Sequence, residues 1–556
     1  MSASTPKKNS FFGGAAILTA SVIVVKLIGA LYKIPLGGIL SDAGFADFNT
    51  AYNIYSLLII ISTGGLPVAL SKMVSEANAV GRGNQVKKVF SLALATFCVL
   101  GTISFCIMAF FPHQLADLMR DSHAAYSILA LAPAVFFICP LSAFRGYFQG
   151  HTLMTPTAVS QVIEALCKLV IGLALASLFM KQELGESVAA AGAILGVSVG
   201  CMLGALYVYL CYRGHVRTLP ASQDEPEDSR SILFTLARLA IPITLSSSVI
   251  ALTNILDTSI MLGRLQDALK LTEDAARDMK GMYDKALTLY NLPASFMVPL
   301  TASVIPHVSA ALKVKRRRQA AQISETTLRT TALLAIPAGV GLFVLGEPII
   351  RLLYPSTDVV LAGWMLSVLG IASIAVCFML VSNSILQAHQ MVALPMATTV
   401  IGCALKLAVG YVLIGNENVG IKGGAISTVA CFGLIALLDM FIIRRTLPRS
   451  LSMARVFVKP VGAAAAMGAA AWAVNGLVTK ALLALNIFVT ETEELLPDGS
   501  AAVALSRTGT ALAVFGAIGV AVVVYFALVI FTRAISKEDL ALIPKGEKLA
   551  RILRVE

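Results

Sequence analysis

The stretch that decides the fold is TASVIVVKLIGALYKIPLGGIL at residues 19–40. It can cross a bilayer, because about 20 helical residues span the hydrocarbon core, yet it contains Lys26 and Lys33. These lysines are seven residues apart and share one helical face, with Gly29 and Gly37 on or near the same stripe. A lysine at bilayer depth costs at least about 2.5 kcal/mol. This face is therefore predicted to look into a wet cavity.

The whole chain has the composition of a membrane protein. It has 556 residues, of which 57% are hydrophobic and 13% charged, whereas soluble domains carry about 25% charged residues. Repeated apolar runs predict an all-α polytopic membrane protein with about 14 transmembrane helices. The predicted spans are 12–40, 46–71, 88–111, 124–147, 155–180, 188–212, 232–262, 285–311, 326–346, 358–386, 393–415, 421–443, 455–480 and 506–532.

The lysines and arginines predict the orientation. If the N-terminus is inside, 26 of the 43 lie in cytoplasmic segments, 11 in external segments and six in or at the edges of spans. This excess, led by KVKRRR at 313–318, follows the positive-inside rule and places both termini in the cytoplasm. The loops thus explain the net charge of +12 without a nucleic-acid partner. The external segment 263–285 is predicted to be a solvated surface helix, and the acidic segment 487–504 a solvated loop.

The chain contains an internal repeat. Residues 145–176 resemble residues 383–414, with Lys168 matching Lys406 at an offset of 238. A six-helix unit repeated in one orientation is typical of transporters with a pseudo-two-fold axis along the membrane normal. The predicted divisions are an N-terminal lobe at 1–212, a cytoplasmic linker at 213–231, a C-terminal lobe at 232–443, and two further helices with a cytoplasmic tail at 444–556.

Four intramembrane lysines are candidates for a cationic substrate-binding cavity. Lys26 lies near mid-bilayer and is the strongest candidate, whereas Lys33 is closer to the outer interface and could snorkel there. Lys168 follows Glu164 by one helical turn, so a self-neutralising structural pair is the alternative. Lys406 has no acid one turn away in its own helix and could face the cavity or pair with another helix.

One acid is a candidate ligand for a coupling ion. Asp257 lies late in the seventh span, where a carboxylate could bind Na⁺ or H⁺. It could instead be exposed near the outer interface or act as the counter-ion of a lysine. No other cofactor is expected.

Helix breakers suggest two hinges. Gly64, Gly65 and Pro67 interrupt the second span, and Pro293 and Pro299 punctuate the eighth. Such breaks line cavities and act as hinges in transporters, although membrane helices also tolerate simple kinks. The sixth span instead carries glycines every fourth residue from 192 to 204, which predicts close helix packing.

No motif in the chain supports an enzyme. The nine cysteines form no CxxC pair, which argues against a disulfide framework or a zinc site. GVSVG at 196–200 matches the serine-hydrolase elbow formally, but that elbow needs a strand–turn–helix and this stretch lies within one helix. There is no P-loop and no HExxH motif.

Three segments carry a resemblance to a known family. Residues 25–77, 144–168 and 290–312 resemble the stage V sporulation protein B type of polysaccharide exporter. That group is similar to the MurJ-type lipid II flippases of the MOP superfamily. The resemblance implies two lobes in a V around a cationic cavity. It also implies that an undecaprenyl-pyrophosphate-linked sugar is carried from the inner to the outer leaflet of a bacterial plasma membrane by alternating access.

The resemblance also bears on individual residues. Lys26 before Leu27-Ile28-Gly29 matches an arginine of MurJ-type flippases, whereas residues 55–61 are apolar and Thr288 stands where those flippases have further arginines. The first candidate cargo is lipid II, and another lipid-linked glycan is the second. The chain could also be a cation-coupled multidrug exporter or a non-transporting scaffold for wall synthesis. Expected partners are membrane lipids and cell-wall synthesis or division proteins.

Overall fold

The computed structural model describes residues 8–219, 222–391, 393–446, 453–495 and 501–532. The tails at 1–7 and 533–556, for which a cytoplasmic location is predicted, lie outside the described residues. Nearly all of the described chain is helical, as expected because a helix satisfies its own backbone hydrogen bonds where no water can.

The structure confirms a polytopic all-α membrane protein. Within the described residues, thirteen helices are long and apolar enough to cross a membrane. The predicted span at 285–311 lies inside α11 (Glu273–Lys313), which is not among those thirteen. The prediction of about fourteen spans thus counts α11 as a span, in addition to helices that meet the length and hydropathy criteria.

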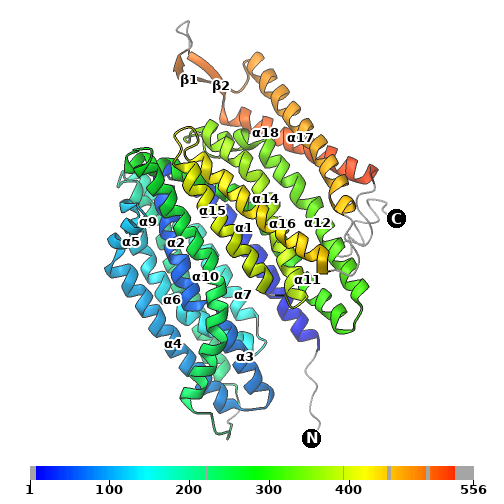
Figure 1. The fold of residues 1–556 in the computed structure, drawn as a ribbon. Coiled ribbons are helices and arrows are strands. Elements are labelled where there is room, and N and C mark those ends of the chain that lie inside the picture. Colours follow the sequence, from blue (N-terminus) through cyan, green and yellow to red (C-terminus); the bar gives the residue numbers. More distant parts are fainter. Residues whose placement is uncertain (1–7, 220–221, 392, 447–452, 496–500, 533–556) are drawn as a thin grey trace. The chain divides into compact units, whose positions relative to one another are not determined.

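The chain divides into two compact units, Met1–Gly281 and Met282–Glu556. The first holds α1 (Lys8–Ile39), α2 (Asp42–Thr63), α3 (Leu66–Ala79), α4 (Gly83–Phe110), α5 (Pro112–Leu118), the 3₁₀ turn η1 (Ser122–Ala124), α6 (Ala125–Gly150), α7 (Thr155–Cys167), the π-helical turn η2 (Lys168–Gly172), α8 (Leu173–Lys181), α9 (Glu186–Val216) and α10 (Ser229–Asp267). Within it, α6 packs on α2, α3, α4 and α9 (Figure 1). The predicted six-helix lobes stay a prediction, and α10 packs on α2, α3 and α4 in the first unit.

The second unit contains most of α11 and the elements that follow it. These are α12 (Arg317–Val344), α13 (Gly346–Leu353), α14 (Val359–Ala388), α15 (Ala393–Ile414), α16 (Lys422–Thr446), α17 (Met453–Ala484), β1 (Val489–Leu495), β2 (Ala501–Leu505) and α18 (Arg507–Phe531). In this unit α14 packs on α12 and α16, and α17 packs on α18.

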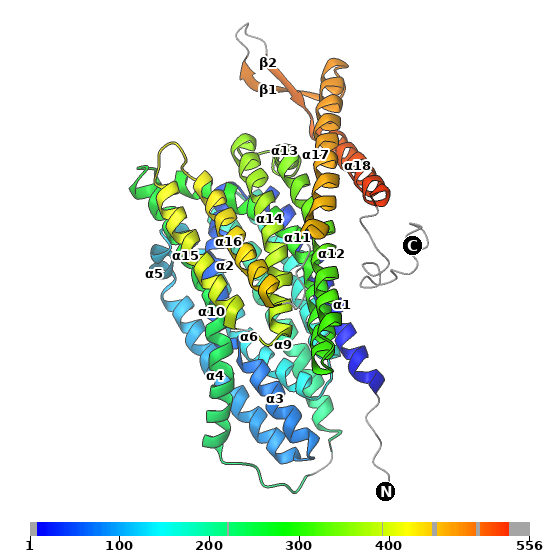
Figure 2. The same ribbon diagram turned by 45° about the vertical axis from the view of Figure 1, so that its right-hand side comes forward.

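The segment predicted to be an acidic loop at 487–504 forms a β-hairpin instead. Strands β1 and β2 pair antiparallel, with Val489 opposite Leu505, and lie at one end of α17 and α18 (Figure 2). The alternation of valine and threonine with acids at the start of VTETEEL favours a strand. Charge alone therefore gave the wrong prediction for this segment.

The two predicted helix breaks have different outcomes. The second span is divided into α2 and α3 by Gly64 and Gly65, with Pro67 in the first turn of α3. A Cβ added at Gly65 would overlap the carbonyl oxygen of Ala240 on α10, so this close approach requires glycine. The predicted break in the eighth span is wrong, because α11 stays helical through Pro293 and Pro299, as membrane helices tolerate proline. Hinge motion at either place stays a prediction.

The linker between α9 and α10 is fixed to the start of α4. The Asp224 carboxylate accepts hydrogen bonds from the backbone N–H groups of Asn84 and Gln85 at 2.8 and 2.9 Å, where the helix N-terminus favours negative charge. Desolvation raises the pKa of Asp224, but the hydrogen bonds from Ser222 and the backbone outweigh it and lower this pKa to about 2.

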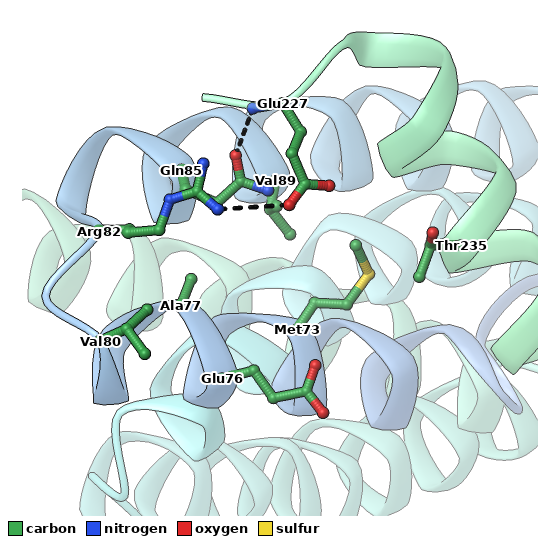
Figure 3. A pocket seen from close by; sticks show the side chains of 9 residues that line it. All are labelled: Met73, Glu76, Ala77, Val80, Arg82, Gln85, Val89, Glu227 and Thr235. Carbon is green, nitrogen blue, oxygen red and sulfur yellow. Dashed lines mark hydrogen bonds and ion pairs between the residues drawn. The ribbon is translucent and has the colours of Figure 1, made fainter. Parts of the chain in front are cut away.

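A small pocket adjoins this linker (Figure 3). Its volume is about 280 Å³, and Met73, Arg82 and Glu227 are among the residues that line it. Arg82 pairs with Glu227 at 3.4 Å. Glu227 of the linker therefore lines the pocket and neutralises the charge of Arg82.

Candidate functional site

An aromatic stripe runs along α2 in the first unit. Phe45, Phe48, Tyr52 and Tyr55 are spaced three or four residues apart and so share one helical face. Successive ring centroids are 6.1, 5.3 and 5.4 Å apart. Tyr32 of α1 joins them, with its ring centroid 6.1 Å from that of Phe48. These five residues, called the aromatic stripe below, connect two of the predicted lysines.

Lys33 lies beside Phe48 of the aromatic stripe. Its Nζ donates a hydrogen bond to Asn49 Oδ1 at 3.1 Å and is 5.9 Å from the centroid of the Phe48 ring. The side chain is half-buried. The location of Lys33 in the cavity stays a prediction.

Lys168 lies further along the aromatic stripe. Its Nζ donates to Tyr52 Oη at 2.9 Å and is 4.8 and 4.6 Å from the ring centroids of Tyr32 and Tyr52. Tyr32 is itself fixed, because its Oη donates to the Ala193 carbonyl oxygen at 3.0 Å. Ring faces attract an ammonium group without neutralising it. Lys168 is therefore placed against the hydroxyl of Tyr52 and the rings of Tyr32 and Tyr52.

The backbone at Lys168 is irregular. Residues 168–172 form a π-helical turn inside an otherwise α-helical span, a feature found often at functional sites. The turn packs tightly on α9, since a Cβ added at Gly196 would lie 2.5 Å from the Gly172 nitrogen. The predicted glycine face of the sixth span is thus confirmed as a close-packing surface, and it supports the turn that carries Lys168.

The prediction that Glu164 could neutralise Lys168 is wrong. The Glu164 carboxylate accepts a short hydrogen bond from the Arg145 guanidinium of α6. Arg145 Nε also donates to Ser160 Oγ at 2.9 Å. The planar guanidinium of Arg145 has several donors in a fixed fork, and it donates to Glu164 and Ser160 at once. Among the described residues, no carboxylate lies within ion-pair distance of Lys168.

The other two predicted lysines lie outside the aromatic stripe. Lys26 of α1 is exposed and makes no hydrogen bond or ion pair with the residues that the structure describes. Lys406 of α15, in the second unit, is buried at 8% exposure. Their roles in substrate binding stay predictions.

Asp257, the candidate cation ligand, is buried on α10 at 9% exposure. The next residue, Thr258, accepts a hydrogen bond from Asn53 Nδ2 at 3.0 Å. Within the described part of the chain, no group of three or more His, Cys, Asp and Glu side chains could hold a metal ion. A role for Asp257 in ion coupling stays a prediction.

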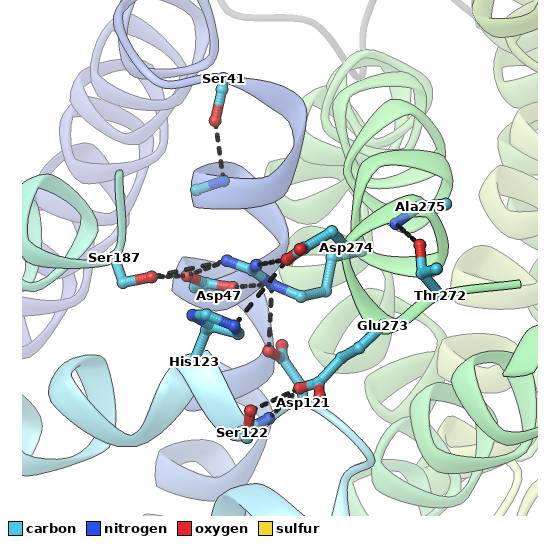
Figure 4. A network of polar contacts seen from close by, with 12 residues as sticks. Ser41, Asp47, Asp121, Ser122, His123, Ser187, Thr272, Glu273, Asp274 and Ala275 are labelled. Atoms are coloured by element: carbon cyan, nitrogen blue, oxygen red, sulfur yellow. Dashed lines mark hydrogen bonds and ion pairs between the residues drawn. The ribbon is translucent and has the colours of Figure 1, made fainter. Parts of the chain in front are cut away.

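The structure also contains a charged network that the sequence analysis missed. Arg277 donates to both carboxylate oxygens of Asp47, at 2.9 and 2.8 Å, and lies 3.5 Å from Asp121. Both aspartates are fully buried and Arg277 is 4% exposed. Figure 4 shows Asp47, Asp121 and Asp274 converging from three elements. Segment 263–285 is therefore not a solvated surface helix here.

This network changes the acidity of its members. The pKa of Asp121 is raised to about 7, mainly by burial and also by the charge of Asp47, against the opposing effects of Thr50, Arg277 and Lys280. The signal that could have found the network is Asp47 itself. It is an acid inside the predicted second span with no basic residue within one turn.

Comparisons with known proteins agree with this architecture. The model of the polysaccharide biosynthesis protein family matches residues 11–312, and the MatE model matches residues 283–412. Stage V sporulation protein B of Bacillus subtilis is 26% identical over 80% of this chain and 86% of its own length. Lipid II flippase MurJ of the same organism is 27% identical over 77% of this chain and 81% of its own.

Solved structures show the same fold. The inward closed conformation of lipid II flippase MurJ has a TM-score of 0.64 at 15% identity, and the match covers 94% of this chain and 98% of the flippase. The inward-facing conformation of a multidrug resistance MATE family transporter of the MOP superfamily has a TM-score of 0.63, also at 15% identity. That match covers 78% of this chain and 98% of the transporter.

Proposed function

Because this chain belongs to the polysaccharide biosynthesis protein family, we propose that it is a flippase for an undecaprenyl-pyrophosphate-linked cell-wall precursor. The first candidate is peptidoglycan lipid II, moved from the inner to the outer leaflet of a bacterial plasma membrane by alternating access. The similarity to a lipid II flippase supports this choice of cargo.

One observation carries the proposal. Lys168 lies inside a membrane-spanning helix, held by a phenol oxygen and two ring faces rather than by a carboxylate. Keeping a cation at that depth is costly, and a pyrophosphate head group would offset the cost. The head group would be held by Lys168 and the other predicted lysines, Lys26, Lys33 and Lys406, while the polyprenyl tail stays in lipid.

The energy source follows from what the sequence lacks. Without a nucleotide-binding motif in the chain, transport would be driven by an ion gradient, the membrane potential or the substrate gradient. Asp257 is the proposed site for a coupling Na⁺ or H⁺. The chain would have no catalytic residues, in keeping with relatives that are flippases or transporters. Both termini would lie in the cytoplasm, where cell-wall synthesis or division proteins could bind.

A second candidate is the export of another lipid-linked glycan. The apolar residues 55–61 and Thr288 replace arginines expected by resemblance to MurJ-type flippases, which favours a different grip on the head group. A multidrug exporter is supported by the MatE match, but cationic lysines beside the aromatic stripe disfavour cationic drugs. A non-transporting scaffold predicts no effect of the lysines on lipid movement.

The test is lipid movement in proteoliposomes. The full chain would be reconstituted with fluorescent lipid II, and the outer-leaflet fraction followed with a membrane-impermeant quencher. We expect transport by wild type, at least tenfold slower transport by Lys168→Met, and slower transport by Lys26→Ala.

Lys72→Met is the matched control, because Lys72 is exposed and pairs with Glu76 on the surface. No lipid II movement by wild type would contradict the lipid II assignment, and a second lipid-linked glycan would then be tried. Wild-type rates in both lysine variants would contradict the cationic site.

A further inference from the structure

A buried carboxyl group joins α16 to α15 in the second unit. Asp439 of α16 is fully buried, and its Oδ1 lies 2.7 Å from Thr398 Oγ1 of α15. Among the described residues, Asp439 forms no ion pair, and its second oxygen, Oδ2, is buried without a hydrogen-bond partner. An ionised carboxylate is costly in the interior unless it is both paired and hydrogen-bonded. The surroundings of Asp439 therefore do not suit a negative charge.

The hydroxyl of Thr398 has two acceptors beside it but only one hydrogen. Its Oγ1 is 2.7 Å from Asp439 Oδ1 and 3.0 Å from the carbonyl oxygen of Pro395. A threonine hydroxyl can donate once and accept through its lone pairs. Both contacts are therefore hydrogen bonds only if Asp439 supplies the second hydrogen, by donating to Thr398 while Thr398 donates to Pro395.

The internal repeat contains the same hydroxyl in the first unit. Thr398 follows Ser160 by 238 residues, which is the offset of the repeat. Ser160 Oγ donates to the carbonyl oxygen of Thr157 at 2.8 Å, just as Pro395 lies three residues before Thr398. Ser160 also accepts a hydrogen bond from Arg145 Nε at 2.9 Å. The hydroxyl at this position of the repeat thus donates within its own helix and accepts from a donor on another helix.

The second unit has a different residue in the place of that donor. The position 238 residues after Arg145 is Asn383, whose Oδ1 is buried without a hydrogen-bond partner. Among the described residues, the partner of Thr398 on another helix is Asp439. Asp439 can replace Arg145 as the donor to this hydroxyl only if its carboxyl group carries a hydrogen.

The other charges near this site lie on the same three helices or directly after them. Helices α14 and α15 pack on α16. Lys406 is two helical turns from Thr398, or about 12 Å along α15, on its buried face. The charged or titratable side chains within eight residues of Asn383, Thr398 or Asp439 are Cys377, His389, Cys403, Lys406, Cys431, Arg444 and Arg445. Since Asp439 itself forms no ion pair within the described residues, a proton is the simplest way to compensate its charge.

We propose that Asp439 is a proton-binding site of the second unit and that Thr398 positions the proton. In the protonated state, the carboxyl group donates to Thr398 Oγ1, and Thr398 donates to the Pro395 carbonyl oxygen. When the proton leaves to water, the Thr398 hydroxyl turns and donates to the carboxylate. The Pro395 carbonyl then keeps a hydrogen bond from Thr399 Oγ1 at 2.7 Å. This site is separate from Asp257, and the use of its proton to drive lipid movement rests on the proposed function.

Infrared difference spectroscopy tests the site directly. The purified full chain in detergent would be compared between about pH 5 and pH 9, a range in which exposed carboxyl groups are already ionised. We expect wild type to show the C=O stretch of protonated carboxylic acid that is lost as the pH rises. Asp439→Asn should lack a signal equal to one carboxylic acid group per chain. Asp439→Glu, which keeps a carboxyl group, should retain a titrating band at a shifted frequency.

The role of Thr398 has its own variants. Thr398→Val removes the hydroxyl and keeps the shape, so it should shift the frequency of the Asp439 band, and Thr398→Ser should restore it. Thr399→Val is the matched control, because Thr399 Oγ1 donates to Pro395 and should leave the band in place. Equal shifts in Thr398→Val and Thr399→Val would disprove the positioning role.

The acid also has a matched control. Glu417→Gln removes an exposed carboxyl group of the same unit and should leave the spectrum between these pH values unchanged. Asparagine can donate to Thr398 as the protonated acid does, so Asp439→Asn should unfold at a temperature near that of wild type. A wild-type difference spectrum in Asp439→Asn would overturn the proposal.

Lipid transport separates this inference from the proposed function. In proteoliposomes with lipid II, an imposed pH gradient should change the wild-type rate about threefold and should have no such effect on Asp439→Asn. A titrating Asp439 band without movement of any lipid-linked glycan would reject the proposed function and leave the proton site. Lipid II movement by wild type, together with a wild-type infrared spectrum in Asp439→Asn, would reject the proton site and leave the flippase.

Discussion

The lysines inside this membrane protein differ in what they contact. The Lys168 ammonium is held by a hydroxyl and two ring faces, which attract a cation without a carboxylate. Lys33 donates to an amide oxygen, that of Asn49. Arg145, by contrast, is paired with Glu164. A buried ion pair stabilises little but is costly to break. At this scale, a cation next to an aromatic ring is a better indication of anion binding than a cation next to an acid.

Arg277 has the opposite role, as a structural counter-ion. Arg277→Met would leave Asp47 and Asp121 buried without their guanidinium, and removal of one partner of a buried pair costs about 3–5 kcal/mol. We expect a loss of this size in the free energy of unfolding, measured by denaturant titration in detergent. Arg351→Gln is the control, because its pair with Glu347 is exposed and is worth at most about 1 kcal/mol. Equal losses in the two variants would disprove the distinction.

Asp121 makes the stability of the first unit depend on pH. Burial raises its folded pKa to about 7, above the value of about 3.9 in an unfolded chain. The folded protein therefore binds more protons between these values, so stability falls as pH rises from about 4 to 7 and then levels off. The facing charges are Asp47, Arg277 and Lys280.

Asp121→Asn is the matching variant, because an amide resembles the protonated acid. We expect the midpoint of thermal unfolding to fall from pH 5 to pH 8 in wild type, and to fall less in Asp121→Asn. An identical decrease in both proteins would show that other groups cause the pH dependence.

Among the secondary-structure elements, η2 and α9 together set the position of Lys168. Gly172 and Gly196 allow the two backbones to approach closely, and the π-helical turn begins at Lys168 itself. Small residues permit such approach in membranes, where packing replaces the hydrophobic effect as the force between helices. The glycine face is thus part of the support for the Lys168–Tyr52 contact.

Gly196→Ala should separate η2 from α9. The added Cβ would lie 2.5 Å from the Gly172 nitrogen, and overpacking of this kind costs about 1–3 kcal/mol. We expect lower stability in detergent and slower lipid transport, since Lys168 would shift relative to Tyr52.

Gly214→Ala in the same helix has open space around its Cβ and should be neutral or slightly stabilising. If Gly196→Ala kept both stability and transport at wild-type levels, the tight contact would not be needed to place Lys168.

For the whole molecule, the repeat explains why similar elements occur in two units. The chain crosses from one unit to the next within α11, whose first turns are fixed in the first unit by Arg277. The same helix carries Tyr290 in the second unit. α11 therefore belongs to both units.

The predicted orientation can be tested by thiol labelling. In a variant without the nine native cysteines, Glu417→Cys should react with a membrane-impermeant maleimide in intact cells, because the positive-inside rule places this loop outside. Gln223→Cys, in the linker between α9 and α10, should react after permeabilisation alone. The reverse pattern would invert the topology.

The sequence by itself determined the class of protein, the helical spans, the repeat and the four lysines. Hydropathy and charge bias are additive along the chain, so local composition was enough for these features. The partners of the charges were decided by the tertiary structure. Glu164 pairs with Arg145 rather than Lys168, Arg277 is buried, and α11 continues through its prolines. The two charge pairings join residues on different elements, because a side chain's partner is fixed by helix packing and not by its neighbours along the chain.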